Sequence, residues 1–218
     1  MKPKKTALIT GASRGIGRAI AEELGQDHHI YAGASKDASQ IVDKLPSAEP
    51  FEADLTDTDA ILRAAEQIEE LDVLVLAAGV MEHGPLEELT DDKWRTMMEV
   101  NLFAPVTLTR ALLPALRRSN GLIIAINSGA GFQGIAENSA YCASKFALRG
   151  FTEALQEEEA GKVRVTSLHP GRTDTDMLAG DDGRPKMDAV NVAKAARLAV
   201  DAGPDAVVEF MRVRPART

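Results

Sequence analysis

The chain has 218 residues, the length of one ordinary domain, and carries a formal net charge of −8 at pH 7. This charge disfavours binding to nucleic acid or to an anionic membrane surface, because both present phosphate groups of the same sign. The single cysteine excludes an internal disulfide and a multi-cysteine metal site, and apolar runs far shorter than the ~20 residues that cross a bilayer indicate a soluble, cytoplasmic protein.

Short runs rich in Val, Ile and Leu alternate along the chain with longer segments of helical period. In chain order, the predicted strands are Thr6–Thr10, His29–Ala34, Pro50–Ala53, Val73–Ala77, Gly121–Asn127, Val163–Leu168 and Val207–Val213. The predicted helices between them are Gly15–Leu24, Ala38–Leu45, Asp57–Glu69, Asp91–Arg117, Ser139–Ala160 and Ala189–Asp201. This order predicts an α/β fold, a doubly wound parallel sheet of seven strands flanked by helices on both faces, in a single three-layer domain over residues 1–218. Such sheets bind ligands beyond the carboxyl ends of their strands.

Two local signals refine this outline. Thr90 precedes two acidic residues, a pattern typical of the N-terminus of a helix, where a hydroxyl caps free backbone N–H groups and acids favour the positive end of the helix. The polar stretch Gly180–Lys186 separates two ordered segments and is predicted to be a mobile loop.

A glycine-rich turn, Thr10–Gly17, joins the first predicted strand to the first predicted helix. Gly11, Gly15 and Gly17 in a GxxxGxG spacing allow the backbone to pass close to a pyrophosphate at the positive end of that helix. A glycine cluster alone is weak, since purely structural turns use glycine as well. Its place between a strand and a helix favours a Rossmann-type dinucleotide site.

The end of the second predicted strand bears on the choice of nicotinamide cofactor. An NAD site usually offers an acidic residue here to the ribose hydroxyls, whereas this chain has Ala34, Ser35 and Lys36. Lys36, together with Arg14 in the glycine-rich turn, is suited to pair with a 2′-phosphate, so NADP(H) is favoured. Solvent-exposed surface charges are the alternative interpretation, and the nearby Asp37 keeps NAD(H) open.

Tyr141 and Lys145 lie four positions apart in a predicted helix, so their side chains project from one face. A phenol titrates near pH ~10, too high for proton exchange at neutral pH, and a cation at ~4–6 Å lowers such a pKa by about one to three units. The spacing alone is common on helices and therefore weak. Ser128 ends the strand before this helix, so its hydroxyl is expected at the ligand-binding edge, where it can donate to a substrate oxygen.

Together these segments resemble the short-chain dehydrogenase/reductase family in its compact, single-domain form. The resemblance rests on TGASRGIG at Thr10–Gly17, on Ser128, on YCASK at Tyr141–Lys145 and on Pro170-Gly171, and it spans nearly the whole chain. It implies an enzyme that acts on CH–OH and C=O groups with a nicotinamide cofactor.

The resemblance also implies a role for each candidate residue. Ser128 orients the carbonyl or alcohol, and Tyr141 transfers the proton. Lys145 holds the nicotinamide ribose and lowers the pKa of the tyrosine, and Asn101 anchors a water molecule in a proton relay. The implied cofactor-binding residues are Gly11, Ser13, Arg14, Gly15, Ile16, Gly17, Ser35, Lys36, Asp54, Leu55, Ala78, Gly79, Tyr141, Lys145, Pro170, Gly171, Thr173 and Thr175.

The sequence departs from the family pattern at two places. The usual Asn-Asn-Ala-Gly after the fourth strand is here Leu76-Ala77-Ala78-Gly79, so hydrogen bonds that brace the central sheet are expected to be missing. The segment between Thr175 and the last predicted helix, which supplies the lid over the substrate in the family, is short. We therefore expect an open substrate pocket.

Other reactive side chains receive structural interpretations. The four histidines lack partners at ligand spacing, so no metal site is predicted, and Cys142 is interpreted as a small, half-buried thiol. By position only, six residues are expected to line the substrate site: Met81, Glu82, Phe132, Gln133, Glu137 and Met177.

The sequence thus predicts hydride transfer between NADP(H) and a small carbonyl or secondary alcohol substrate, with reduction favoured. Two alternatives remain open: an NADP(H)-binding redox sensor without turnover, and a sugar-nucleotide epimerase or dehydratase on the same fold. The intact Ser128, Tyr141 and Lys145 argue against the sensor, and an epimerase normally adds a substrate domain.

A homodimer or homotetramer is also expected from the resemblance, through the helices Asp91–Arg117 and Ser139–Ala160. Leu108, Leu112 and Leu116 form an apolar stripe on the first of these helices, although such a stripe more often faces the core of its own chain.

Overall fold

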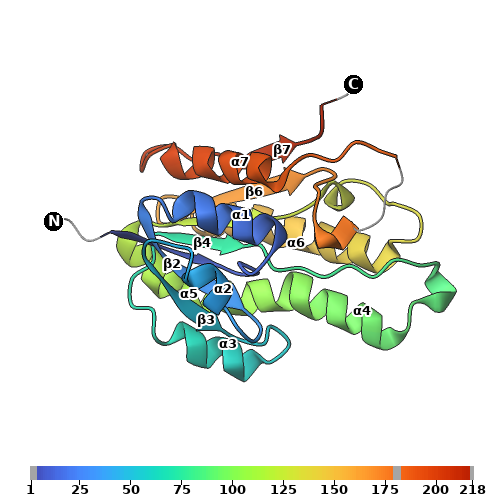
Figure 1. Ribbon diagram of the computed structural model, residues 1–218, viewed down its shortest axis with the longest axis horizontal. Coiled ribbons are helices and arrows are strands. Elements are labelled where there is room, and N and C mark those ends of the chain that lie inside the picture. Colours follow the sequence, from blue (N-terminus) through green and yellow to red (C-terminus); the bar gives the residue numbers. More distant parts are fainter. Residues whose placement is uncertain (1–3, 179–182, 217–218) are drawn as a thin grey trace.

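A computed structural model describes residues 4–178 and 183–216 of the chain, and its centre is one parallel sheet (Figure 1). The strands are β1 (Lys5–Ile9), β2 (His28–Ala34), β3 (Ala48–Glu52), β4 (Val73–Leu76), β5 (Leu122–Ile126), β6 (Arg164–Pro170) and β7 (Phe210–Val213). Their order across the sheet is β3-β2-β1-β4-β5-β6-β7, and every neighbouring pair is parallel. The predicted fold class is confirmed.

Burial explains why these runs become strands. All residues of β4 and β5 are buried, as expected for central strands of a sheet that helices cover on both faces. The edge strands β3 and β7 are more exposed: most residues of β3 and all residues of β7 are partly or fully exposed. β7 begins at Phe210, three residues later than Val207 where the sequence predicted it, because its ladder with β6 starts only where Phe210 pairs with Ser167.

Two helical layers cover the sheet. The helices are α1 (Gly15–Leu24), α2 (Ser39–Val42), α3 (Thr58–Ala65), α4 (Asp91–Met98), α5 (Ala104–Ser119), α6 (Ser139–Glu158) and α7 (Ala189–Asp201). α1 and α7 pack side by side on one face, and α3, α5 and α6 cover the other, so each face has its own apolar core (Figure 1). Thr90 caps α4 as predicted, since its hydroxyl accepts the Lys93 backbone N–H at 3.4 Å.

The predicted helix Asp91–Arg117 is wrong as one continuous helix. A π-helical turn, Glu99–Phe103, separates α4 from α5. Pro105 supplies a physical reason: it has no backbone N–H, and in an α-helix its ring would clash with the carbonyl of the residue four positions earlier, Asn101. The wider turn places Asn101 in the interior, where its side chain is completely buried.

The apolar stripe on α5 belongs to the core of this chain. Leu108, Leu112 and Leu116 are each at most 1% exposed and pack against the sheet through the same cluster as α3. This is the alternative that the sequence left open, and the stripe therefore gives no support for contact between subunits.

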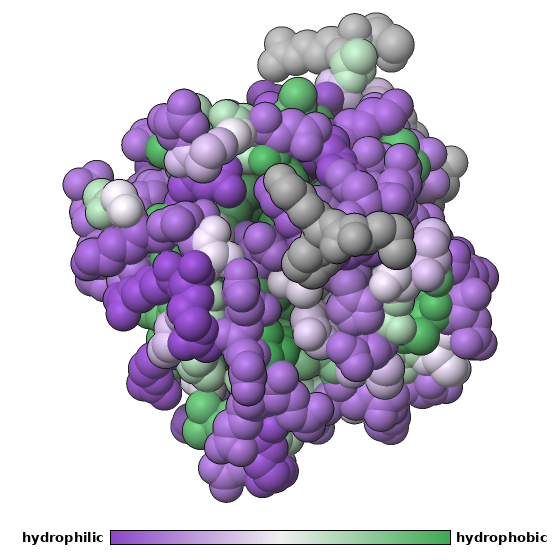
Figure 2. All heavy atoms as spheres, turned by 90° about the vertical axis from the view of Figure 1, so that its left-hand side faces the viewer, coloured by the Kyte–Doolittle hydropathy of each residue, from purple (hydrophilic) through white to green (hydrophobic). Residues whose placement is uncertain are grey.

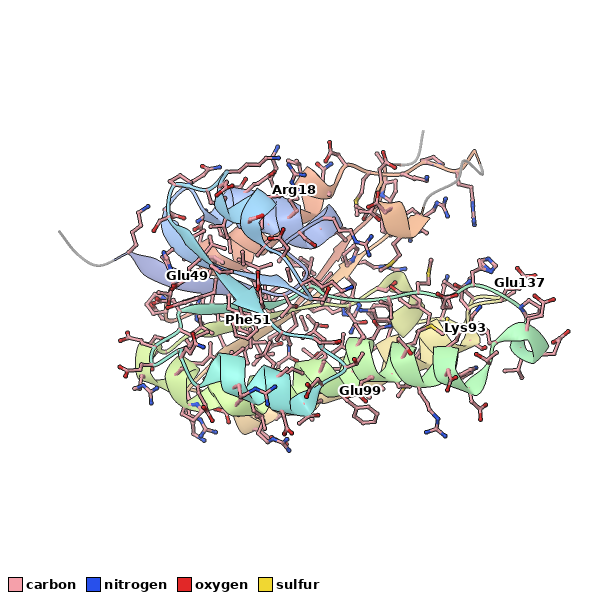
Figure 3. All side chains as sticks on the ribbon, turned by 60° about the horizontal axis from the view of Figure 1, so that its bottom comes forward. Arg18, Glu49, Phe51, Lys93, Glu99 and Glu137 are labelled. Carbon is pink, nitrogen blue, oxygen red and sulfur yellow. The ribbon has the colours of Figure 1, made fainter. Side chains whose placement is uncertain are left out.

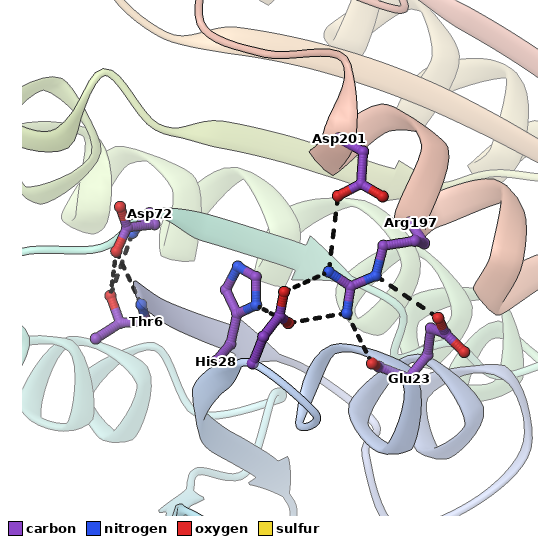
Figure 4. A network of polar contacts seen from close by, with 7 residues as sticks. Thr6, Glu23, His28, Asp72, Arg197 and Asp201 are labelled. Atoms are coloured by element: carbon purple, nitrogen blue, oxygen red, sulfur yellow. Dashed lines mark hydrogen bonds and ion pairs between the residues drawn. The ribbon is translucent and has the colours of Figure 1, made fainter. Parts of the chain in front are cut away.

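An ionic network ties the two helices of the first layer together at the edge where the strands begin. Arg197 of α7 contacts Asp27 at 2.9 Å, Glu23 of α1 at 3.6 Å and Asp201 at 3.8 Å (Figure 4). His28 of β2 also contacts Asp27, at 2.6 Å. The end of the molecule seen in Figure 2 is mainly hydrophilic, and none of the helices in the described residues is long and apolar enough to cross a membrane.

Candidate active site

The glycine-rich turn leaves β1 and enters α1 at the carboxyl edge of the sheet. Gly11 and Gly15 have φ angles of +67° and +56°, a region that favours glycine. A Cβ atom on Gly17 would lie 2.3 Å from the carbonyl oxygen of Gly11, so a side chain is excluded there too. The backbone N–H of Ala12 donates to the Gly33 carbonyl at 2.8 Å and fixes the turn against β2. The glycines therefore form a bare backbone surface at the N-terminus of a helix.

A cleft of about 490 Å³ opens over this turn. Twelve of the predicted cofactor-binding residues line it: Gly11, Ser13, Arg14, Gly15, Ile16, Gly17, Ser35, Asp54, Leu55, Ala78, Gly79 and Thr175. Residues that the sequence did not single out complete the wall, namely Thr10, Gly33, Ala34, Phe51, Ala53, Ala77, Val80, Val100 and Asp176. Most of these lie one or two positions from a predicted residue. The exception is Phe51 of β3 (Figure 3), and knowing the β2–β3 register, which pairs Gly33 with Phe51, is what would have identified it.

Six predicted cofactor-binding residues are absent from the wall of the cleft: Lys36, Pro170, Gly171 and Thr173, and also Tyr141 and Lys145 of α6. Lys36 is exposed just beyond β2, and Pro170 is buried at the end of β6. The backbone N–H of Gly171 donates to the Val213 carbonyl at 2.7 Å, and the hydroxyl of Thr173 donates to the Gly171 carbonyl at 3.1 Å. The contacts that the structure gives Gly171 and Thr173 are thus within the protein, where they shape the strand end.

The segment after β4 is braced by a different residue from the one expected. The hydroxyl of Thr10 accepts the backbone N–H groups of Ala77 at 2.9 Å and Ala78 at 3.0 Å, and it lies 3.3 Å from the Val75 carbonyl. The Leu76-Ala77-Ala78-Gly79 segment has no side-chain amide that could brace the sheet, and the Thr10 hydroxyl supplies hydrogen bonds to it instead. A threonine at the end of β1 joins the two central strands.

Asn101 holds the same segment from below the cleft. Its side-chain oxygen accepts the Val80 N–H at 2.8 Å, and its amide nitrogen donates to the Val80 carbonyl at 2.9 Å and to the Ser144 hydroxyl at 3.0 Å. A Cβ atom on Gly79 would lie 3.2 Å from the Asn101 oxygen and 3.9 Å from the Lys145 Nζ. Gly79 thus leaves the Lys145 ammonium group close to the wall of the cleft.

Ser128 follows β5 at the carboxyl edge of the sheet, as predicted, and is half-buried. Its backbone N–H donates to the side-chain oxygen of Asn127 at 3.0 Å, and its hydroxyl accepts the Ala130 N–H at 3.1 Å. Its side chain also interacts with Tyr141, and this interaction lowers the pKa of the phenol. Ser128 and Tyr141 are therefore brought together.

Tyr141 and Lys145 lie on one face of α6, as their spacing predicted. They are 9% and 4% exposed, and the Lys145 Nζ lies 5.8 Å from the centre of the Tyr141 ring. The ammonium group donates to the Ile126 carbonyl at 3.0 Å. Burial lowers the pKa of Lys145 to about 8.

The expected lowering of the tyrosine pKa does not hold in the chain by itself. Burial raises the pKa of the Tyr141 phenol above 10.0, and this effect outweighs the interaction with Ser128. The Lys145 ammonium points to the Ile126 carbonyl. An activated phenol therefore requires a further positive charge close to the ring.

A sequence profile for short chain dehydrogenases matches residues 5–184. The chain belongs to this family. A relative, an uncharacterized oxidoreductase of Staphylococcus epidermidis, is 33% identical over 97% of this chain and 97% of that protein. The resemblance stated from the sequence is confirmed.

Solved structures of other proteins agree with this assignment. An alcohol dehydrogenase from the archaeon Thermococcus sibiricus, complexed with 5-hydroxy-NADP, has a TM-score of 0.88 at 28% identity and covers 97% of this chain and 96% of its own. A metagenomic short-chain oxidoreductase in complex with NADP has a TM-score of 0.85 at 33% identity, with 99% of both chains covered.

In this short-chain dehydrogenase, three of the six residues expected at the substrate site lie in the wall of the cleft over the glycine-rich turn: Met81, Glu82 and Met177. Phe132 lies elsewhere: its ring packs 4.5 Å from that of His169 and 5.5 Å from that of Phe210.

Two loops of the short-chain dehydrogenase join across the open end of the site. The backbone N–H of Gly84 donates to the Glu137 carbonyl at 2.9 Å, and Glu137 has a φ angle of +60° that an L-residue rarely adopts. Lys93 of α4 pairs with Glu82 at 3.3 Å in the same region, and Figure 3 shows Lys93 and Glu137 at one end of the molecule.

Two further predictions concern neighbouring residues. Cys142 is buried, with its Sγ atom 3.8 Å from the Gln133 carbonyl, so it occupies the structural position expected of a small thiol. The predicted loop Gly180–Lys186 is described only from Gly183 onward, and residues 180–182 lie outside the described residues. At its base, Thr173 pairs with Met187 in an isolated bridge.

Proposed function

We propose that this short-chain dehydrogenase transfers a hydride between NADP(H) and a small carbonyl or secondary alcohol, with Tyr141 as the general acid and base. The observation that carries the proposal is the junction of Tyr141 with Ser128, beside a Lys145 ammonium group that lies near Gly79 on the wall of the cleft. The bare glycine turn at the start of α1 fits a dinucleotide, because a Cβ atom at Gly17 would collide with backbone. When bound, the nicotinamide supplies the hydride donor or acceptor.

The chain's own residues then divide the work. The Ser128 hydroxyl donates to the substrate oxygen and holds it next to the Tyr141 phenol, which gives or takes the proton. Lys145 lies near Gly79 on the wall of the cleft and 5.8 Å from the centre of the tyrosine ring, so it would hold the ribose of a bound cofactor. A positive charge carried by the oxidised cofactor would lower the pKa of the phenol and oppose the increase caused by burial. Asn101 fixes the Val80 backbone by two hydrogen bonds, and we retain for it the anchoring of a proton-relay water.

NADP(H) is the proposed cofactor because two basic side chains, those of Arg14 and Lys36, lie at the predicted positions around the end of β2. Arg14 lines the cleft with a side chain that is 74% exposed, and Lys36 extends from the turn after β2. The carboxylate of Asp37 accepts the backbone N–H of Ser39 at 2.8 Å. Two relatives of known structure hold NADP or a derivative of it.

The reaction is tested by following NADPH absorbance while the protein is mixed with a panel of aldehydes, ketones and quinones. We expect turnover of at least one carbonyl and loss of turnover in Tyr141→Phe by a factor of about 10³ or more. Tyr31→Phe is the matched control, since Tyr31 is the other of the two tyrosines in the sequence and lies on β2, outside the wall of the cleft. Normal turnover by Tyr141→Phe would contradict the proposal, whereas tight NADPH binding without turnover of any carbonyl would favour the redox sensor.

The cofactor preference is tested by titrating NADPH and NADH into the protein. NADPH is expected to bind at least ~10-fold more tightly, because each ion pair with the 2′-phosphate is worth about 1–2 kcal/mol. Lys36→Ala and Arg14→Ala should each reduce NADPH affinity and leave NADH affinity unchanged. Lys44→Ala provides a control for the loss of one surface charge. Equal binding of the two cofactors by the unmodified protein would contradict this assignment.

A further inference from the structure

His169 lies directly beneath the catalytic serine. The parallel register pairs Leu168 of β6 with Ile126 of β5, so the next residue along β6 reaches the backbone that follows β5. The His169 side chain is fully buried, and its Nδ1 atom lies 3.1 Å from the Ser128 carbonyl oxygen. Its Nε2 atom lies 2.7 Å from the Ser167 hydroxyl.

These two contacts define one protonation pattern. A backbone carbonyl only accepts hydrogen bonds, so Nδ1 must carry the hydrogen in the contact with Ser128. Nε2 is then the acceptor for the Ser167 hydroxyl. Burial lowers the pKa of His169 to about 4, so at neutral pH the ring is uncharged and this single N–H is the one that it has.

Apart from the contact of its side chain with Tyr141, the other hydrogen bonds of Ser128 are made within its own loop. Asn127 accepts the backbone N–H, Ala130 donates to the hydroxyl, and the Gly131 N–H donates to the carbonyl at 3.1 Å. All of these belong to residues 127–131, which move together if the loop shifts. The His169 contact comes from β6, 41 residues away in the chain, and it attaches Ser128 to the sheet, one residue beyond the point where the Asn127 N–H donates to the Leu168 carbonyl at 2.8 Å.

We propose that His169 is a positioning residue: its Nδ1–H bond to the Ser128 carbonyl sets where the serine hydroxyl stands relative to Tyr141 and the substrate oxygen. This inference rests on the proposed function, in which that hydroxyl orients the reacting oxygen. Because catalytic groups displaced by ~1 Å lose about 100-fold in rate, a bond of this kind matters for turnover more than for binding of the cofactor.

His169 also packs as an aromatic ring, and this second role must be separated from the first. Its ring lies 4.5 Å from Phe132 and 4.8 Å from Phe210. His169→Phe keeps an apolar ring in place but removes both nitrogen contacts. His169→Asn removes the ring but places an amide N–H near the position of Nδ1. His169→Phe therefore preserves the packing role, and His169→Asn preserves the positioning role.

The positioning role and the packing role predict opposite rankings of the two variants by kcat. For positioning, His169→Phe should lower kcat for NADPH-dependent carbonyl reduction by about 10- to 100-fold. His169→Asn should recover most of this loss, and KM for NADPH should stay within about twofold in both variants. Thermal unfolding should rank them the other way, with the Phe variant more stable than the Asn variant. If kcat instead follows stability, so that Phe is better than Asn in both, His169 is a packing residue and the proposal is wrong.

His28 provides the matched control, because it is also buried and bonded to an oxygen, that of Asp27, but lies at the opposite end of the sheet. His28→Asn should lower stability and leave kcat unchanged. A loss of kcat in the control comparable with that in His169→Phe would overturn the proposal, since any buried histidine would then have the same effect.

A spectroscopic measurement tests the hydrogen bond without turnover. Long-range ¹H–¹⁵N spectra of the histidine rings at neutral pH, assigned by the signals lost in His169→Asn, should show the neutral Nδ1–H form. An Nε2–H ring would exclude donation to Ser128 and overturn the proposal. If no carbonyl is turned over, the proposed function fails, but the ring form still tells whether His169 holds the serine loop.

Discussion

Lys145 carries an ammonium group into the interior of the molecule, where it is 4% exposed. In the unfolded chain a lysine titrates near 10.5, whereas burial lowers the pKa of Lys145 to about 8 in the folded protein. The unfolded state therefore holds this proton more tightly, and below pH 8 the folded state bears the full penalty of the buried charge, roughly 3 kcal/mol. The penalty decreases as the pH rises from about 8 towards 10.5.

Replacing this lysine should therefore increase stability while removing function. We expect Lys145→Met to raise the free energy of unfolding at pH 7 by about 2 kcal/mol, after subtraction of the lost hydrogen bond to Ile126. Turnover should fall by a factor of about 10² or more. Urea unfolding at pH 7 and pH 9.5 measures the effect, and the gap between the variant and the unmodified protein should narrow at the higher pH. A variant that is less stable at pH 7 would contradict the buried-charge argument.

For single residues, the spacing of side chains along the sequence predicted their place in the fold better than it predicted their pKa values. The four-residue separation of Tyr141 and Lys145 correctly placed both on one face of α6. It did not predict that burial would raise the pKa of the phenol, because the depth of burial depends on residues distant in the chain. The brace from Thr10 to Ala77 was missed for the same reason, since the two residues are 67 positions apart.

At the level of elements, the π-helical turn decides where Asn101 lies. The apolar period runs on through both helices, so the pattern predicted one continuous helix over Asp91–Arg117. Pro105 was the available signal, because its ring excludes the α-helical position of the Asn101 carbonyl. The turn directs the Asn101 side chain to Val80, next to the cleft.

Pro105→Ala should relax this turn. The new backbone N–H provides a donor for the Asn101 carbonyl, so we expect stability to be unchanged or slightly higher and kcat to fall by about 10-fold as Asn101 moves relative to Val80. Pro114→Ala, at the second proline inside α5, is the control and should leave kcat unchanged. Thermal unfolding and steady-state kinetics measure both quantities. Unchanged kcat in Pro105→Ala would show that the turn does not set the site.

At the scale of the whole molecule, the parallel sheet could be predicted from the sequence, but the contacts between residues of neighbouring strands could not. Apolar runs that alternate with helical segments indicate the parallel strands of such a sheet, and the predicted seven-stranded architecture is confirmed. The position of His169 beside Ser128 depends on the register of β5 with β6. From the sequence it was one of four histidines without a partner, because a partner 41 residues away leaves no local pattern.

The same architecture gives the molecule a built-in reporter. Cys142 is the one thiol in the sequence, and it is 6% exposed directly beside Tyr141 in the chain. A maleimide can reach its sulfur only while the start of α6 is displaced from the loop that contains Gln133. The rate of alkylation therefore measures how often the start of α6 opens, and the measurement needs no substrate.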